Sequence, residues 1–189
     1  MGYRLLLAEN TVQAANVIAN TVTETAFVSA LPVWQNLDGV SNVAIPGSNA
    51  GRMIKLKCFG YISSLVTTPG TLTLKLKWGA TIIGQTAAIQ LPAAAMVNNA
   101  WELDAFILIV EAWTSGRIAC QGTGWMDMGL NSGAAAMLPF AMLNVGTVKT
   151  GQVVVNTTLA ASITLTAQFS IANAANSITL SQMIAEEVS

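Results

Sequence analysis

Apolar and polar residues alternate strictly in two segments of this chain. In TLTLKLKW (71–78) and SITLTAQF (162–169), every second residue is apolar. The positions predicted to face inward are Leu72, Leu74, Leu76, Trp78, Ile163, Leu165, Ala167 and Phe169. An alternation with a period of two predicts β-strands that have one buried face and one wet face. Gly79 and Ala80 follow the first segment, so we expect a turn into a further strand over residues 81–85.

Other strand-like segments recur along the chain, and no long helical pattern stands between them. They cover residues 21–30, 52–65, 81–87, 101–113, 117–128, 152–158 and 176–188. Stretches rich in turn-forming residues separate several of them, at 46–51, 67–70, 114–116 and 173–176. Eight or nine strands at this spacing predict an all-β sandwich or barrel.

The composition indicates whether the exterior of such a fold faces water, a membrane or other protein subunits. The 189 residues suit one domain, with or without an arm. Charged residues make up 9% of the chain, against roughly 25% in an ordinary soluble domain. The longest apolar runs, 105–110 and 134–143, are shorter than the roughly 20 residues of a membrane-spanning helix. The N-terminus has no basic segment followed by an apolar run, so we expect no signal peptide. We therefore expect a soluble protein whose exterior is largely covered by other subunits.

Two segments carry this expectation of covered surface. Residues 105–110 are apolar at every position, which predicts a strand covered on both faces, with a second copy of the chain as the simplest cover. Residues 129–149 read as a long apolar connection that packs across a neighbouring subunit, because contiguous apolar surface rarely stays exposed. Alternatively, this connection caps one end of its own sandwich. Its large apolar residues include Met137, Leu138, Phe140 and Met142.

The chain lacks the residues on which most catalytic and metal sites depend. It has no histidine, which excludes Ser-His-Asp and Cys-His triads. Its two cysteines, Cys58 and Cys120, are predicted to be buried free thiols and cannot form a zinc cluster. Glu102 and Asp104 share one strand face beside Trp101, where we expect a solvated strand end rather than a catalytic pair. We predict no enzymatic activity, no metal and no cofactor.

Binding remains as the alternative to catalysis. The formal net charge is −1 and the eight basic residues are scattered, so we expect no nucleic-acid partner. Among the five tryptophans, Trp78 and Trp113 have the inward parity of their strands and are assigned to the core. Trp34 and Trp125 are the candidates for a carbohydrate-binding face.

The order of these features carries a family resemblance. A Thr-rich strand at 20–33 leads through residues 45–64 to the hairpin at 71–86. A long strand, a Gly turn and a return strand come next at 101–126, and two strands around an Asn-Ser turn close the chain at 162–188. This succession resembles jelly-roll structural proteins of tailed-bacteriophage virions. Members of that family are capsid decoration (cement) proteins, head fibres or tail-associated proteins, commonly trimers.

The resemblance implies an all-β, antiparallel jelly-roll β-sandwich of about eight strands over residues 21–189, preceded by an arm or short helix over residues 1–20. It implies a non-enzymatic homotrimer that binds the major capsid protein and stabilises the head shell. The expected location is the capsid surface of a virion, after synthesis in the host cytoplasm, with no membrane partner. Alternatives are a head-fibre or tail-associated receptor-binding domain, or a carbohydrate-binding β-sandwich module that takes a host-surface glycan.

The N-terminal stretch is the natural arm in this scheme. It could add a strand to a capsid subunit or anchor on it. The residues assigned to this contact are Tyr3, Arg4, Leu5, Leu6 and Leu7. Alternatively, residues 1–11 are simply the first strand of the sandwich.

Overall fold

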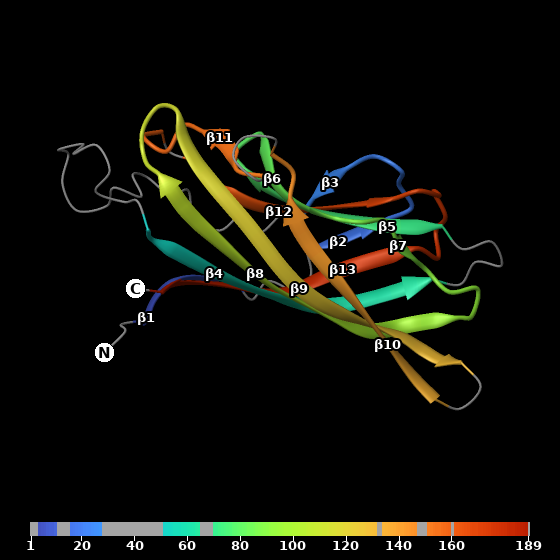
Figure 1. Ribbon diagram of the computed structural model, residues 1–189. Helices are drawn as coiled ribbons and strands as arrows, with labels where there is room; N and C mark the ends of the chain where they lie inside the picture. Colours follow the sequence, from blue (N-terminus) through green and yellow to red (C-terminus); the bar gives the residue numbers. More distant parts are fainter. Residues whose placement is uncertain are drawn as a thin grey trace.

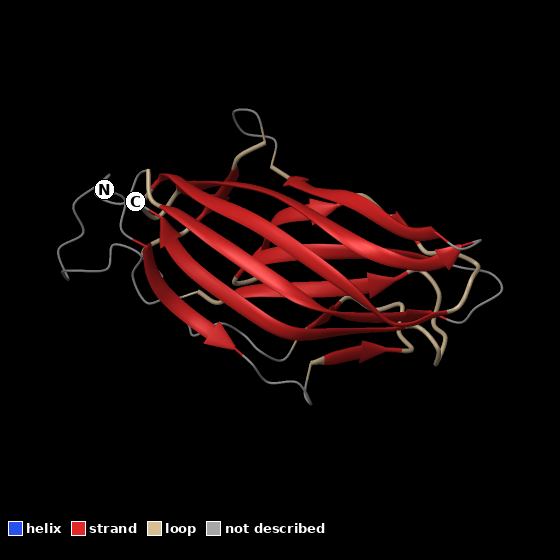
Figure 2. Cartoon of the chain, turned by 90° about the horizontal axis from the view of Figure 1, so that it is seen from below, coloured by secondary structure: helices blue, strands red, loops and turns tan. Residues whose placement is uncertain are grey.

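The fold consists of antiparallel strands (Figures 1 and 2). The computed structural model describes residues 4–10, 16–27, 51–64, 70–131, 134–146, 151–159 and 161–188, and this part contains no helix. Its strands are β1 (Arg4–Asn10), β2 (Val17–Ala19), β3 (Thr25–Ala26), β4 (Met53–Ser64), β5 (Thr71–Trp78), β6 (Thr81–Thr86), β7 (Ile89–Gln90), β8 (Met96–Glu111), β9 (Gly116–Asn131), β10 (Ala134–Asn144), β11 (Val153–Val155), β12 (Ile163–Phe169) and β13 (Ser177–Val188). The predicted all-β fold is confirmed. The strand count is higher than predicted because β1, β2, β7 and β10 lie outside the predicted strand-like segments.

The strands form one hydrogen-bonded sheet that folds over on itself into two layers. The order is β1-β13-β4-β8-β9-β10-β6-β5-β12-β3, with β2, β7 and β11 paired beside this path. Strands β13, β4, β8 and β9 form one layer, and β6, β5 and β12 form the other (Figure 1). Strand β10 joins the layers, because Met142 pairs with both Gly122 of β9 and Thr86 of β6. The chain changes layer between β2 and β3, β3 and β4, β4 and β5, β7 and β8, β11 and β12, and β12 and β13, which makes the sandwich jelly-roll-like.

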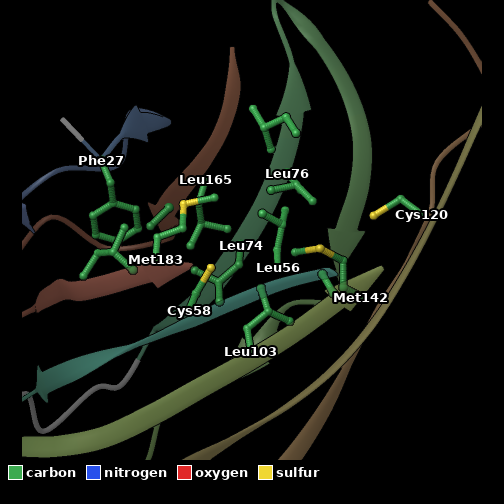
Figure 3. Close-up of a cluster of buried hydrophobic side chains, with 14 of the residues drawn as sticks. Phe27, Leu56, Cys58, Leu74, Leu76, Leu103, Cys120, Met142, Leu165 and Met183 are labelled. Atoms are coloured by element: carbon green, nitrogen blue, oxygen red, sulfur yellow. The ribbon is translucent and has the colours of Figure 1, made fainter. Parts of the chain in front are cut away.

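The core lies between the two layers and follows the predicted alternation. Every inward position predicted in β5 and β12 is buried, including Trp78, which is 4% exposed. Side chains of β4, β8 and β13 point toward those of β5 and β12, among them Leu56, Leu103, Met183, Leu74 and Leu165 (Figure 3). The turn at 79–80 is also confirmed, with Gly79 in the left-handed region at φ 56°.

The two cysteines are buried as free thiols, as predicted. Cys58 of β4 pairs with Leu103 of β8, and Cys120 of β9 pairs with Ile107. The thiols are therefore two strands and four residues apart, which is at least about 9.5 Å at a spacing of roughly 4.8 Å per strand. That separation is too large for a disulfide bond.

The N-terminal region is sheet rather than helix wherever the structure describes it. Strand β1 pairs antiparallel with β13 from Arg4 opposite Val188 to Asn10 opposite Met183. Strand β2 pairs with the opposite end of β13. The helix considered within residues 1–20 is thus wrong over the described residues. The alternative, a first strand tied into the sheet, is what these residues form.

The predicted connection over residues 129–149 requires a larger correction. Most of it is strand β10, which folds back on β9 and then pairs with β6. Leu138, Phe140 and Met142 face the core, whereas Met137 and Ala141 are exposed. Pro139 lies in the middle of this strand and weakens its sequence signal, because proline cannot donate to a ladder hydrogen bond.

Residues 16–27, here called the closing segment, cross from the edge of one layer to the edge of the other. The segment pairs with β13 through β2 and with β12 through β3. The Phe27 ring stacks on the buried Trp101 ring, with centroids 6.5 Å apart. On the outside, the Glu24 carboxylate binds Lys75 and Lys77 of β5. The closing segment thereby ties the two free edges of the folded sheet together.

Candidate functional site

The solvent-facing side of β13, β4, β8, β9 and β10, here called the outer face, carries the densest set of chemically useful side chains. Strand register aligns these residues in rungs that run across the sheet. The aromatic rung consists of Gln182, Phe59, Glu102, Trp125 and Pro139. The adjacent charged rung consists of Ile184, Lys57, Asp104, Thr123 and Ala141. A third rung contains Glu186, Lys55, Phe106 and Gln121.

A groove of about 470 Å³ lies over the aromatic rung. Its walls include the rings of Phe59, Tyr61 and Trp125 and the polar groups of Glu102 and Gln182. The Tyr61 side chain is 48% exposed, and Trp125 is half-buried. The groove is therefore lined by aromatic rings that solvent can reach, with hydrogen-bonding groups between them.

A bulge in β13 shapes one wall of this groove. The register between β13 and β4 shifts between Leu180 and Gln182, opposite Gly60. A Cβ atom at Gly60 would collide with the carbonyl oxygen of Thr179, so only glycine allows this close backbone approach. The same carbonyl accepts a hydrogen bond from Trp101 Nε1 at 3.1 Å, which anchors the buried indole beneath the groove. Bulges often re-aim side chains beside binding sites.

Glu102 is the charged residue that lines the groove. Lys57 Nζ lies 2.7 Å from Glu102 Oε1, and Trp125 Nε1 donates a hydrogen bond to Glu102 Oε2 at 3.2 Å. The hydrogen bond from Lys57 holds the pKa of Glu102 below its usual value, against the opposing effect of burial. The same contact raises the pKa of Lys57. The site therefore presents an ionised carboxylate and an indole ring that fix each other's orientation.

A smaller polar pocket of about 220 Å³ lies beyond the groove along β4 and β13. It is lined by Lys55, Lys57, Ile184 and Glu186. Lys55 Nζ lies 3.8 Å from Asp104 Oδ2 and 5.8 Å from the centroid of the Phe106 ring. Lys57 lines this pocket and binds Glu102, which lines the groove, so this ion pair lies between the two hollows.

Another part of the outer face, over β8 and β10, is apolar. Phe106, Leu108 and Leu143, here called the apolar strip, are 39%, 37% and 60% exposed. A shallow hollow of about 320 Å³ is lined by Phe106, Leu143 and their neighbours on β9 and β10. Residues 105–110 are thus covered on their inner face by the core, whereas Phe106 and Leu108 face outward uncovered within this chain. Their cover by a second copy stays a prediction.

The predicted partner-binding residues fall into three groups. Tyr3 lies outside the described residues, and Arg4–Leu7 lie in the β1 backbone paired with β13, with a register shift between Leu6 and Ala8. Met137 is 54% exposed, so its role at an interface stays a prediction. Leu138 and Phe140 are partly buried against the core, and Met142 is fully buried. The assignment of Met142 to a partner surface is wrong, because its side chain packs where the two layers join.

The structure also places several aromatic and acidic candidates differently from the prediction. Trp125 lies in the groove, whereas Trp34 is outside the described residues. Trp113 is 42% exposed in the turn between β8 and β9, so its assignment to the core is wrong. Glu102 and Asp104 lie in the middle of the long strand β8 rather than at its end, and each faces a lysine of β4.

Phe59 and Tyr61 were missed at the sequence level. They share the parity of Lys55 and Lys57 in segment 52–65, which places all four on the solvent face. That parity was the available signal. Within the described part of the chain, no cluster of acidic or cysteine residues could hold a metal ion, and no helix is long and apolar enough to cross a membrane.

Comparisons with known proteins identify a solved structure with distant similarity to this chain. No family model and no curated protein matches this chain. Among solved structures, the chain is similar to the CBM2 module of the evolved Dit of Lactobacillus casei BL23 phage J-1. The identity is 12%, the match covers 90% of this chain and 74% of that one, and the TM-score is 0.34. A TM-score this low carries no argument about fold or function, so the function of this chain must be inferred from the groove itself.

Proposed function

We propose that this protein is a non-catalytic binding module that recognises a carbohydrate in the groove of the outer face. One observation carries the proposal. The Trp125 and Tyr61 rings flank a fixed carboxylate, Glu102, in a groove open to solvent. The C–H bonds on one side of a sugar ring pack favourably on the electron-rich face of an aromatic ring. The sugar hydroxyls would donate to Glu102 and bond to Gln182.

The setting that we propose is a bacteriophage virion, in which the module meets a glycan of the host surface. The succession of strands that resembles virion jelly-roll proteins supports this setting. The two carboxylates of β8 on the outer face, Glu102 and Asp104, are each paired with a lysine of β4. Such paired charges suit the binding of hydroxyl groups better than proton transfer.

The test is a glycan array probed with the wild-type protein and with Trp125→Ala. We expect wild-type binding to at least one glycan and a loss of about tenfold or more in the variant, which corresponds to about 1.4 kcal/mol. Trp113→Ala is the matched control, because it removes an exposed tryptophan outside the groove. Circular dichroism verifies that both variants fold. Absence of wild-type binding, or an equal loss in Trp113→Ala, would contradict the proposal.

A second candidate function rests on the apolar strip. Three exposed apolar side chains on β8 and β10, on one face of the sheet, favour a protein interface, which supports a homotrimeric capsid decoration protein that binds the major capsid protein. Light scattering coupled to size exclusion would then give the mass of three chains. Phe106→Ser would lower that mass, and Trp125→Ala would leave it unchanged. A wild-type monomer that fails to bind undecorated capsids would remove this candidate.

A further inference from the structure

The groove and the polar pocket lie one after the other along β4 and β13, and together they are here called the path. Tyr61, Phe59, Lys57 and Lys55 alternate along β4 and face the same side of the sheet. On β13, Gln182 borders the groove, and Ile184 and Glu186 border the pocket. From Tyr61 to Lys55 the path spans six residues, which is about 20 Å at roughly 3.4 Å per residue. A single pyranose ring would fill only a fraction of this length.

The character of the path changes from one end to the other. The end at Tyr61 and Trp125 offers aromatic faces for stacking. The end at Lys55 and Glu186 offers an ammonium donor and a carboxylate acceptor, and Ile184, opposite Lys57, adds an apolar contact beside them. A ligand that uses both ends must carry ring faces and hydroxyl groups at regular intervals, as an oligosaccharide does.

The charges along the path point to an uncharged ligand. Lys57 is paired with Glu102 and Lys55 lies near Asp104, and Glu186 adds a third carboxylate beside the two ammonium groups. Three carboxylates and two ammonium groups together carry a net charge of −1. An anionic sugar would have to displace a carboxylate from its lysine, and it would meet no net positive potential.

We infer that the ligand is an extended, uncharged oligosaccharide that lies along β4 and β13, with one part stacked in the groove and the next part hydrogen-bonded in the polar pocket. The inference rests on the proposed carbohydrate-binding function. It adds the length of the ligand, its charge class and a second subsite. Each further sugar unit along the path gains contacts until the pocket at Lys55 is filled.

The test uses the sugar that binds best on the array, supplied as a series from mono- to hexasaccharide, with affinities measured by isothermal titration calorimetry. We expect affinity to rise about tenfold or more along the series and then level off, a change of about 1.4 kcal/mol. Ile184→Phe places a larger side chain in the pocket and should abolish the gain from the longer members. Ile82→Phe is the matched control, since Ile82 is a half-buried isoleucine on β6 of the other layer.

The outcomes separate the two proposals. If no glycan binds the wild-type protein, the proposed function fails and this inference fails with it. If binding is lost in Trp125→Ala but affinity is independent of ligand length, the function stands and the extended path is overturned. The extended path is also overturned if Ile184→Phe keeps the full gain. A preference for sulfated or uronate-containing members over neutral ones of equal length would overturn the uncharged class.

Discussion

Glu24 holds the closing segment on the outside of the second layer, and its loss should be measurable as a loss of stability. Its carboxylate lies 2.7 Å from Lys75 Nζ and 3.0 Å from Lys77 Nζ, and it accepts a hydrogen bond from Thr166 Oγ at 3.3 Å. The side chains of Glu24, Lys75 and Lys77 are 24%, 15% and 25% exposed. Glu24→Gln keeps the shape of the side chain and removes its charge.

The magnitude can be worked out from these contacts. A hydrogen bond to a charged group contributes about 1.5–3 kcal/mol when it is well shielded, and partial exposure reduces this figure. Gln retains one weaker contact, so we expect Glu24→Gln to lower the free energy of unfolding by about 2 kcal/mol at pH 7. For a chain of this size the corresponding fall in Tm is about 4–8 °C.

The pH dependence supplies a sharper test. The hydrogen bond from Lys75 is the main cause that lowers the pKa of Glu24 below its ordinary value of 4.5. A carboxylate with a lowered pKa in the folded state stabilises the protein above its unfolded pKa, and this contribution disappears as the pH falls through the folded pKa. The difference between wild type and Glu24→Gln should therefore be complete at pH 7 and shrink below pH 4.5.

The assay is urea denaturation followed by circular dichroism at a series of pH values, with Glu111→Gln as the matched control. Glu111 also pairs with a cation, Arg117, but its side chain is 51% exposed, so its replacement should cost less than about 1 kcal/mol. Equal effects of the two substitutions at pH 7 would refute the reasoning. A Glu24→Gln effect that stays constant down to pH 3 would refute it as well.

Three further predictions concern the core and the groove wall. Leu74→Ala removes a fully buried side chain between the layers and should cost about 2–5 kcal/mol in urea denaturation; a loss below about 1 kcal/mol would show that the layers collapse onto the cavity. Burial raises the pKa of both Cys58 and Cys120 to about 12, so a thiol reagent at pH 8 should modify them only after unfolding, and rapid modification of the native protein would contradict their placement. Gly60→Ala should destabilise by about 1–3 kcal/mol through overpacking against the Thr179 carbonyl, and an unchanged Tm would disprove this close approach.

Part of the fold was predictable because its signal is local. The alternation in 71–78 and 162–169 correctly predicted the inward residues of β5 and β12, since side-chain direction in a strand reverses at every residue. The turn at Gly79 was equally readable. Strand β10 was not, because Pro139 and the small residues before it carry little strand preference, and its pairing with β9 and β6 supplies the order that its own sequence lacks.

The sequence by itself determined an all-β chain with few charges and no histidine. It also indicated Trp125 as one of two candidates for a carbohydrate-binding face. Only the tertiary structure decided that Phe59, Glu102 and Trp125 stand in one rung, and that Trp113 lies outside the core. The physical reason is register. A strand's own pattern fixes which face each side chain occupies, but pairing between distant strands fixes which side chains become neighbours on that face.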